Sequence, residues 1–266
     1  MPSSLPLYLE AILEDFLEGH ESRSIHLGYW PVGSKISGGL VAGQAQLDDL
    51  VIKAGDLADG LSVLDVACGL GGLIEKLNAR YRRLELTGLN IDPRQLNICN
   101  RLRPKANNMF RWVEADASRL PFPDASFDRL FCVEAMFHFA SRGEFLSEAF
   151  RVLKPEGRLV VTDILLIMPA TAFLEVHAQL LAGYGPWPEP WIAPRQLVEH
   201  CANAGFTDIH LINITAETFP TYRFIMPSQG VLSSDPLARS LAALHGLHAN
   251  GNLVYCLGSA HRHSWH

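Results

Sequence analysis

The chain is poor in cysteine, and its few thiols lack the spacing of a metal site or a disulfide framework. It has five, and no two form a C-x-x-C pair: Cys68, Cys99, Cys132, Cys201 and Cys256. Structural zinc sites and disulfide-rich folds depend on closely spaced cysteines. We therefore expect no metal site, and reduced thiols that pack as small core residues.

Long apolar runs and an excess of positive charge are also missing. The most apolar stretch, residues 159–170, contains Asp163 and falls short of the roughly 20 residues that cross a bilayer. The N-terminus carries Glu10 and Glu14 where a signal peptide would be basic and then apolar. The net charge is −6, whereas nucleic-acid binding needs a basic face. We expect a cytoplasmic protein without a transmembrane segment or a nucleic-acid partner.

What is present is an alternation of two hydrophobic patterns. The chain has 266 residues, of which 48% are hydrophobic and 19% charged, enough for one sizeable core. Short runs rich in branched residues predict strands at 62–66, 84–90, 110–114, 127–133, 158–162, 206–214 and 253–257. Amphipathic patterns predict helices at 6–17, 40–54, 73–81, 92–102, 145–153, 194–204 and 236–245. Strands that alternate with helices predict an α/β fold with a doubly wound, mostly parallel sheet.

The pattern also suggests a division of the chain. Residues 1–56 are predicted to form a helical cap that leads into the site, and residues 57–166 the ligand-binding core. Residues 167–205 are rich in proline, glycine and tryptophan and are expected to form a lid. Residues 206–266 would complete the core with strands and a helix.

The first predicted strand runs into a glycine-rich loop, Gly69 to Gly72, at the edge where parallel sheets bind ligands. A dinucleotide site would need a third glycine where Ile74 stands, and an acid at the end of the second strand, where the chain has Asn90. Both observations argue against a nicotinamide or flavin cofactor.

Several motifs together resemble the class I S-adenosylmethionine-dependent methyltransferases. Residues 63–72, VLDVACGLGG, resemble the first motif of that family. Residues 114–117, followed by LPFPD at 120–124, are similar to the third motif and the loop after it, and residues 151–157 to the turn before the fifth strand. Residues 88–91 with Gln95 resemble small-molecule enzymes that act on sterols, tocopherols, sugars and natural products. The resemblance implies a Rossmann-like, seven-stranded sheet with the last strand antiparallel and a helical cap.

By matching position, the resemblance implies an S-adenosylmethionine site, with S-adenosylhomocysteine as product. Gly69 and Gly71 would approach the methionine moiety, and Gln46 would contact its end. Asn90 would bond a ribose hydroxyl beside Ile91, while Asp116 and Ala117 would receive the adenine. The full set of expected cofactor residues is Gln46, Asp65, Ala67, Gly69, Gly71, Asn90, Ile91, Gln95, Asp116, Ala117 and Glu134. In the alternative interpretation, the glycines make turns and Asp116 caps one.

His138 is the candidate catalytic base, because it follows the fourth strand and could take a proton from a hydroxyl nucleophile. Asp163, on the neighbouring fifth strand, could orient the imidazole. Alternatively, His138 packs among aromatic residues and Asp163 caps a helix. Together with His138, Tyr29, Trp30, Trp187 and Trp191 are candidates for the wall of the substrate pocket.

The leading hypothesis is therefore O-methylation of a small secondary metabolite by a His–Asp pair. C- or N-methylation of a terpenoid or heterocycle is the alternative, as is a cyclase or regulator that binds the cofactor without methyl transfer. The expected partner is a small-molecule acceptor, and a homodimer is left open.

Overall fold

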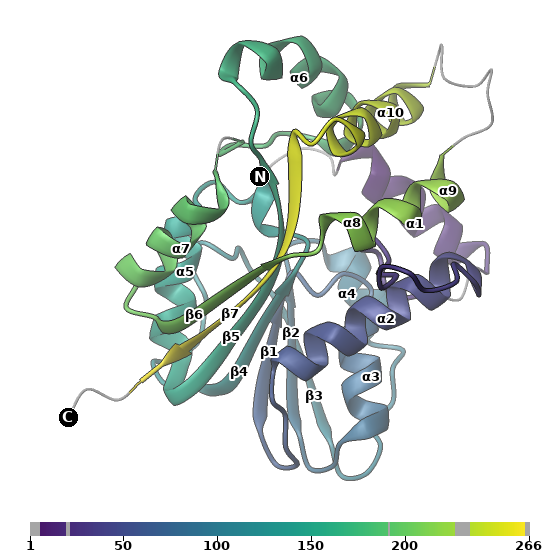
Figure 1. Ribbon diagram of the computed structural model, residues 1–266. Coiled ribbons are helices and arrows are strands. Elements are labelled where there is room, and N and C mark those ends of the chain that lie inside the picture. Colours follow the sequence, from purple (N-terminus) through teal and green to yellow (C-terminus); the bar gives the residue numbers. More distant parts are fainter. Residues whose placement is uncertain (1–5, 20–21, 191, 227–234, 264–266) are drawn as a thin grey trace.

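The computed structural model describes residues 6–19, 22–190, 192–226 and 235–263. Its centre is a seven-stranded sheet in the order β3-β2-β1-β4-β5-β7-β6 (Figure 1). Only β7 runs antiparallel to its neighbours, and the other described pairs are parallel. The predicted Rossmann-like sheet, with its antiparallel last strand, is confirmed. The strands are β1 Ser62–Val66, β2 Glu85–Asn90, β3 Met109–Glu114, β4 Phe127–Val133, β5 Leu153–Leu166, β6 Thr207–Asn213 and β7 Leu253–Arg262.

Helices cover both faces of this sheet, because successive strand residues point to opposite sides. Val63 packs with α2 and α3 in one core cluster, and Leu64 packs with α5 and α7 in another. These helices lie on opposite sides of the sheet in Figure 1. The helices are α1 Leu7–Leu17, α2 Gly39–Ala54, α3 Gly72–Arg80, α4 Pro93–Cys99, α5 Arg142–Val152, α6 Ala170–Tyr184, α7 Pro194–Asn203, α8 Thr215–Thr218, α9 Tyr222–Ile225 and α10 Pro236–Ala249. Two short 3-10 turns, η1 Met136–His138 and η2 Phe219–Thr221, complete the set.

Local capping chemistry fixes two helix starts. Asp92 accepts a hydrogen bond from the Arg94 amide at 3.0 Å, with Pro93 as first helical residue, which confirms the predicted cap of α4. The predicted start of α5 at residue 145 was three residues late. Ser141 is its N-cap and accepts from the Glu144 amide at 3.3 Å, so the helix begins at Arg142.

The largest differences from the predicted elements lie in the second half of the chain. β5 continues to Leu166 because β7 pairs with it from Gly157 to Leu166. Asp163 therefore lies inside a strand and not at its end. α10 continues to Ala249, and residues 215–225, where the sequence predicted no element, form short helical turns. α6 and α10 pack together over one end of the sheet (Figure 1).

Candidate active site

A cavity of about 740 Å³ opens at the carboxyl ends of β1 to β4. One half is walled by the strand tips and by residues 23–26, and the other by α1, η1 and the segment that follows α6. Nine of the expected cofactor residues line it, namely Asp65, Ala67, Gly69, Asn90, Ile91, Gln95, Asp116, Ala117 and Glu134. The sheet thus brings together side chains from four separate strand ends, as the topology predicts.

The loop after β1 passes the cavity in left-handed backbone conformations. Gly69 has φ +54° and Ala67 φ +56°, values that are uncommon for residues with a side chain. Gly71 is a different case, because it is the N-cap of α3 with φ +82° and does not line the cavity. A Cβ at Gly71 would press on Cys99 and Leu102 at 3.2 Å. Gly71 therefore forms the turn from which α3 starts, and its contact with a cofactor stays a prediction.

Polar groups at the next two strand tips are held in place. The Asn90 amide donates to Gln95 Oε1 at 3.0 Å, and its carbonyl accepts from the Asp92 amide at 3.0 Å. Asp116 accepts from the Ser118 amide at 2.8 Å through Oδ1. Asp116 therefore caps a turn and also lines the cavity, so the two interpretations of this residue are compatible.

Asp65, at the end of β1, is 3% exposed and reaches the cavity. None of the described residues donates a hydrogen bond to its carboxyl group in this structure. Burial raises its pKa to about 8, and the nearby charge of Asp48 acts in the same direction, although His26 lowers it. A buried acid with this pKa lacks a cation, and a positively charged ligand would supply one.

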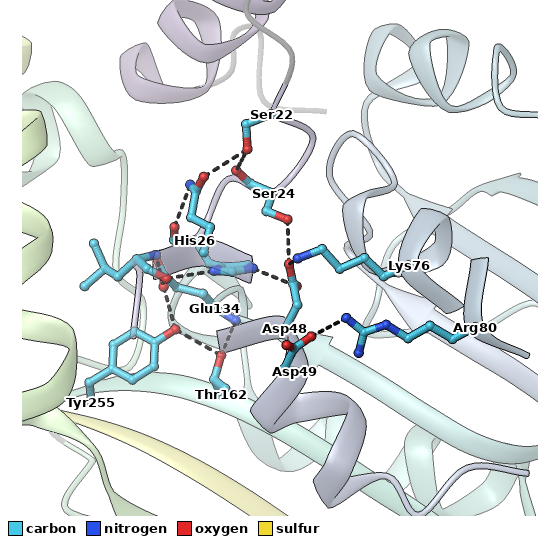
Figure 2. Close-up of polar contacts among 12 residues, drawn as sticks. Ser22, Ser24, His26, Asp48, Asp49, Lys76, Arg80, Glu134, Thr162 and Tyr255 are labelled. Carbon is cyan, nitrogen blue, oxygen red and sulfur yellow. Dashed lines mark hydrogen bonds and ion pairs between the residues drawn. The ribbon is translucent and has the colours of Figure 1, made fainter. Parts of the chain in front are cut away.

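A charged network that the sequence did not reveal joins His26, Asp48 and Lys76 (Figure 2). Both ring nitrogens of His26 face acceptors: Nδ1 lies 2.7 Å from the Leu27 carbonyl and Nε2 lies 2.9 Å from Asp48 Oδ1. Since both partners only accept, each nitrogen must donate, and the ring is an imidazolium. Asp48 also accepts from Ser24 at 2.7 Å and from Lys76.

The pKa shifts of His26 and Asp48 agree with an imidazolium at His26. Burial alone would lower the pKa of His26, but the charge of Asp48 and its hydrogen bond outweigh burial and raise it. Burial would likewise raise the pKa of Asp48, yet His26 and Lys76 lower it to about 2. The pair holds residues 23–26 over the glycine-rich loop and lines the cavity.

Glu134 follows β4 in a left-handed conformation, φ +53°, and is fixed from three sides. Its Oε2 accepts from the Leu27 amide at 2.8 Å and from the Tyr255 hydroxyl at 2.6 Å, and its own amide donates to Thr162 Oγ1 at 2.9 Å (Figure 2). Burial raises its pKa. Glu134 is therefore a positioned carboxylate at the centre of the cavity wall.

His138 lines the half of the cavity that α1 and the segment after α6 also enclose. Its Nε2 is 2.8 Å from the hydroxyl of Tyr8 on α1, and the two rings stack at 5.7 Å. Burial lowers the pKa of His138 to about 4; a hydrogen bond with the Pro186 backbone acts in the opposite direction, and the charge of Arg142 acts with burial. The imidazole is thus neutral near pH 7, and Nε2 faces the group that α1 presents.

The predicted pairing of His138 with Asp163 is wrong. Asp163 is fully buried inside β5 and accepts from Arg142 Nε at 2.6 Å and from Arg142 Nη2 at 3.4 Å. It does not line the cavity. Pairing with β7 on both sides of residue 163 keeps it within the sheet, so its carboxylate meets the first residue of α5 and not the histidine.

Three other predicted residues lie away from the cavity. Gln46 contacts the Ala42 carbonyl at 3.5 Å, because the inner face of α2 at this level carries Gln44 and Asp48, which are two positions away from residue 46 on either side. Tyr29 and Trp30 are held outside the cavity. Their amides donate to the Gly43 and Glu217 carbonyls at 2.9 Å.

The rings of Trp30 and Trp187 pack against other aromatic side chains. The Trp30 ring packs on Phe224 at 5.5 Å. Trp187 is buried against Phe137 at 4.7 Å, behind the cavity-lining residues Pro186 and Pro188. Trp191 lies outside the described residues.

Gly72 shows how closely residues 23–24 approach the glycine-rich loop. A Cβ on Gly72 would lie 2.9 Å from the backbone of Arg23 and 2.8 Å from Ser24 Oγ. We expect Gly72→Ala to lower the free energy of unfolding by about 1–3 kcal/mol and to weaken cofactor binding. Gly246→Ala is the matched control, because a Cβ there meets nothing within 4 Å and should stabilise α10 by about 0.5–1 kcal/mol. Equal denaturation midpoints for the two variants would contradict this packing.

The described part of the chain has neither a cluster of metal ligands nor a membrane-spanning helix. It contains no group of three or more His, Cys, Asp or Glu side chains arranged to hold a metal ion. No helix in the described part of the chain is long and apolar enough to span a bilayer.

Comparison with known sequences gives consistent matches. A family model described as a methyltransferase domain matches residues 64–161. The methyltransferase GfsG of Streptomyces halstedii is 32% identical over 231 residues, which cover 82% of this chain and 78% of that protein. The 27-O-demethylrifamycin SV methyltransferase of Amycolatopsis mediterranei is 30% identical, with 78% and 75% covered.

Solved structures of similar fold cover almost the whole chain. The [4+2]-cyclase SpnF superposes with a TM-score of 0.75 at 21% identity, covering 100% of this chain and 99% of SpnF. The geranyl diphosphate C-methyltransferase of Streptomyces coelicolor A3(2), solved with S-adenosyl-L-homocysteine, gives 0.71 at 17% identity, covering 98% and 100%. At these identities the likeness concerns the fold.

Proposed function

Because the chain belongs to the class I S-adenosylmethionine-dependent small-molecule methyltransferases, we propose that it methylates a hydroxyl group of an uncharged, largely apolar natural product. The observation that carries this proposal is a neutral His138 on the apolar wall of a cavity that nine of the expected cofactor residues also line. A hydroxyl that enters the apolar half meets Nε2 beside the cofactor residues.

The polar half has the donors and acceptors that the cofactor requires. Asp65 supplies a carboxyl group without a protein partner, suited to the ammonium of the methionine moiety. Asn90 and Gln95 present amides, and the Gly69 conformation lets the backbone approach the ligand closely. When bound, S-adenosylmethionine would supply a methyl carbon on a sulfonium sulfur, which a nucleophile can attack with S-adenosylhomocysteine as the leaving group.

The residues of the apolar half then have two tasks. The cavity walls bring the hydroxyl into line, which can contribute up to about 7–11 kcal/mol of the barrier. His138 Nε2 accepts the hydroxyl proton as the new O–C bond forms, and the protonated ring later returns it to solvent. The Tyr8 hydroxyl, which lies 2.8 Å from Nε2, marks the position that the acceptor hydroxyl would take.

The uncharged wall favours a neutral acceptor. The described residues that line this half come from 6–9, 138–140 and 181–188, and none of them is Asp, Glu, Lys or Arg. A diphosphate would require cations or a metal at this wall. This argues against the C-methylation of prenyl diphosphates, although C-methylation of a neutral acceptor remains the second candidate.

Two relatives are consistent with this substrate class. By their names, one acts on 27-O-demethylrifamycin SV and another methylates the 3''-oxygen of erythromycin. The second is 28% identical over 214 residues, and this chain covers 69% of it.

The test is an assay with S-adenosylmethionine and a panel of acceptors. We expect 27-O-demethylrifamycin SV or another hydroxylated macrocycle to yield S-adenosylhomocysteine and an O-methyl product, identified by mass and by its carbon chemical shift. Geranyl diphosphate is the charged control and should give no product. A product methylated at carbon would contradict the proposal that a hydroxyl is the nucleophile. Cofactor binding without turnover of any acceptor in the panel would favour a cyclase or regulator that does not transfer methyl groups.

A further inference from the structure

The segment after α6 carries three prolines in Gly185–Pro190, which we call the proline wall. Pro186 and Pro188 line the apolar half of the cavity, which we call the acceptor half because the proposed function places the acceptor there. Trp187 between them packs on Phe137, the residue before His138. Proline fixes φ and removes the backbone donor, so these residues contribute few main-chain hydrogen bonds of their own. Something else must hold the wall against the core.

A reciprocal pair of contacts with Arg142 provides that anchor. The Arg142 amide, the first of α5, donates to Glu189 Oε2 at 2.8 Å. Arg142 Nη1 donates to the Glu189 main-chain carbonyl, also at 2.8 Å. The carboxylate thus lies at a helix N-terminus, where negative charge is favoured. One residue of the wall is held both by its side chain and by its backbone.

Arg142 is itself fixed from the other side. It is 1% exposed, donates through Nε to Asp163 Oδ2 at 2.6 Å, and donates through Nη2 to the Ile164 carbonyl at 3.4 Å. The guanidinium therefore joins the middle of β5 to the wall of the acceptor half. This use of its five donors suits Arg and not Lys.

From these contacts we propose that Arg142 and Glu189 are positioning residues for the acceptor: they set the distance between the proline wall and His138. Asp163 serves the site through Arg142 and not through the imidazole. The inference rests on the proposed function, because it assigns the proline wall to the acceptor. It predicts that loosening the anchor weakens acceptor binding and leaves the cofactor half unchanged.

The test uses Glu189→Ala, with Ser141→Ala as matched control. Both changes remove a cap from the N-terminus of α5, and so both lower stability similarly. Of the two residues, only Glu189 belongs to the proline wall. The probe is Nile red, a neutral apolar dye, titrated into full-length protein saturated with S-adenosylhomocysteine. We expect Glu189→Ala to bind the dye about tenfold more weakly, as for loss of one charge-assisted hydrogen bond, while Ser141→Ala binds it as wild type does.

Further readouts separate positioning from general loosening. Calorimetry should give the same affinity for S-adenosylhomocysteine in all three proteins, and Glu189→Gln, which keeps an acceptor for the Arg142 amide, should restore most of the dye affinity. Equal losses in Glu189→Ala and Ser141→Ala, or no loss in either, would overturn the proposal. So would wild-type protein that takes up no dye. Failure of methyl transfer would leave these binding results unaffected and would count only against the proposed function.

Discussion

Replacement of His138 by Ala should lower the turnover number by about 10²–10⁴-fold, the usual contribution of a general base. The structure provides the reason: the residue is half-buried and unprotonated near pH 7, and Nε2 faces the apolar half of the cavity. No other described side chain on that side of the cavity offers a base, since its remaining lining residues are apolar apart from Tyr8. Steady-state kinetics with the acceptor found in the panel would measure the loss.

Two controls make this expectation specific. The affinity for S-adenosylhomocysteine should be unchanged in His138→Ala, because His138 lies outside the strand tips that we propose hold the cofactor. His210→Ala changes an exposed histidine on β6 and should leave turnover as in wild type. Undiminished turnover in His138→Ala would exclude the histidine as base and direct attention to Glu134.

The second large effect concerns Asp65 and the binding of a cationic cofactor. In the free protein its pKa is raised to about 8, chiefly by burial, so the group is protonated near neutral pH. A bound ammonium lowers that pKa again, and binding therefore releases a proton. Between pH 5.5 and 7 the association constant should rise with pH, by up to about tenfold per unit. Calorimetry in buffers of different ionisation enthalpy would measure the released proton.

Asp65→Asn tests the same assignment by a different route. Loss of a hydrogen bond between charged groups should weaken S-adenosylmethionine binding by about 10–100-fold at pH 7. The dependence of affinity on pH should disappear at the same time. A variant that kept the pH slope would show that another group, such as His26 or Glu134, releases the proton.

The strands of the core could be predicted from the sequence because they are short, apolar and bounded by turn residues. β1 and β4 were predicted with their observed bounds, and the N-cap of α4 could be identified from Asp92 and Pro93. β5 was predicted too short. Its extension depends on pairing with β7, a partner about 100 residues later in the chain, and no local pattern carries that information.

The same limit applied to the candidate site. Nine of the residues that the family motifs indicated line the cavity, whereas the pairings of charged groups were missed or mistaken. His26 is separated from Asp48 by 22 residues, and Asp48 from Lys76 by 28. No sequence motif indicated Arg142, which is the partner of Asp163 in the structure. Ion pairs of this kind are decided by which side chains the completed fold places together, so they require the structure.

The position of β7 has a consequence for biosynthesis. This strand inserts between β5 and β6, although it is the last of the seven in the chain, and its Tyr255 donates to Glu134 at the centre of the cavity. Until residues 253–262 have been made, the sheet has a gap between β5 and β6, and Glu134 lacks its contact with the Tyr255 hydroxyl. A chain truncated before residue 253 should therefore not be retained on an immobilised cofactor analogue.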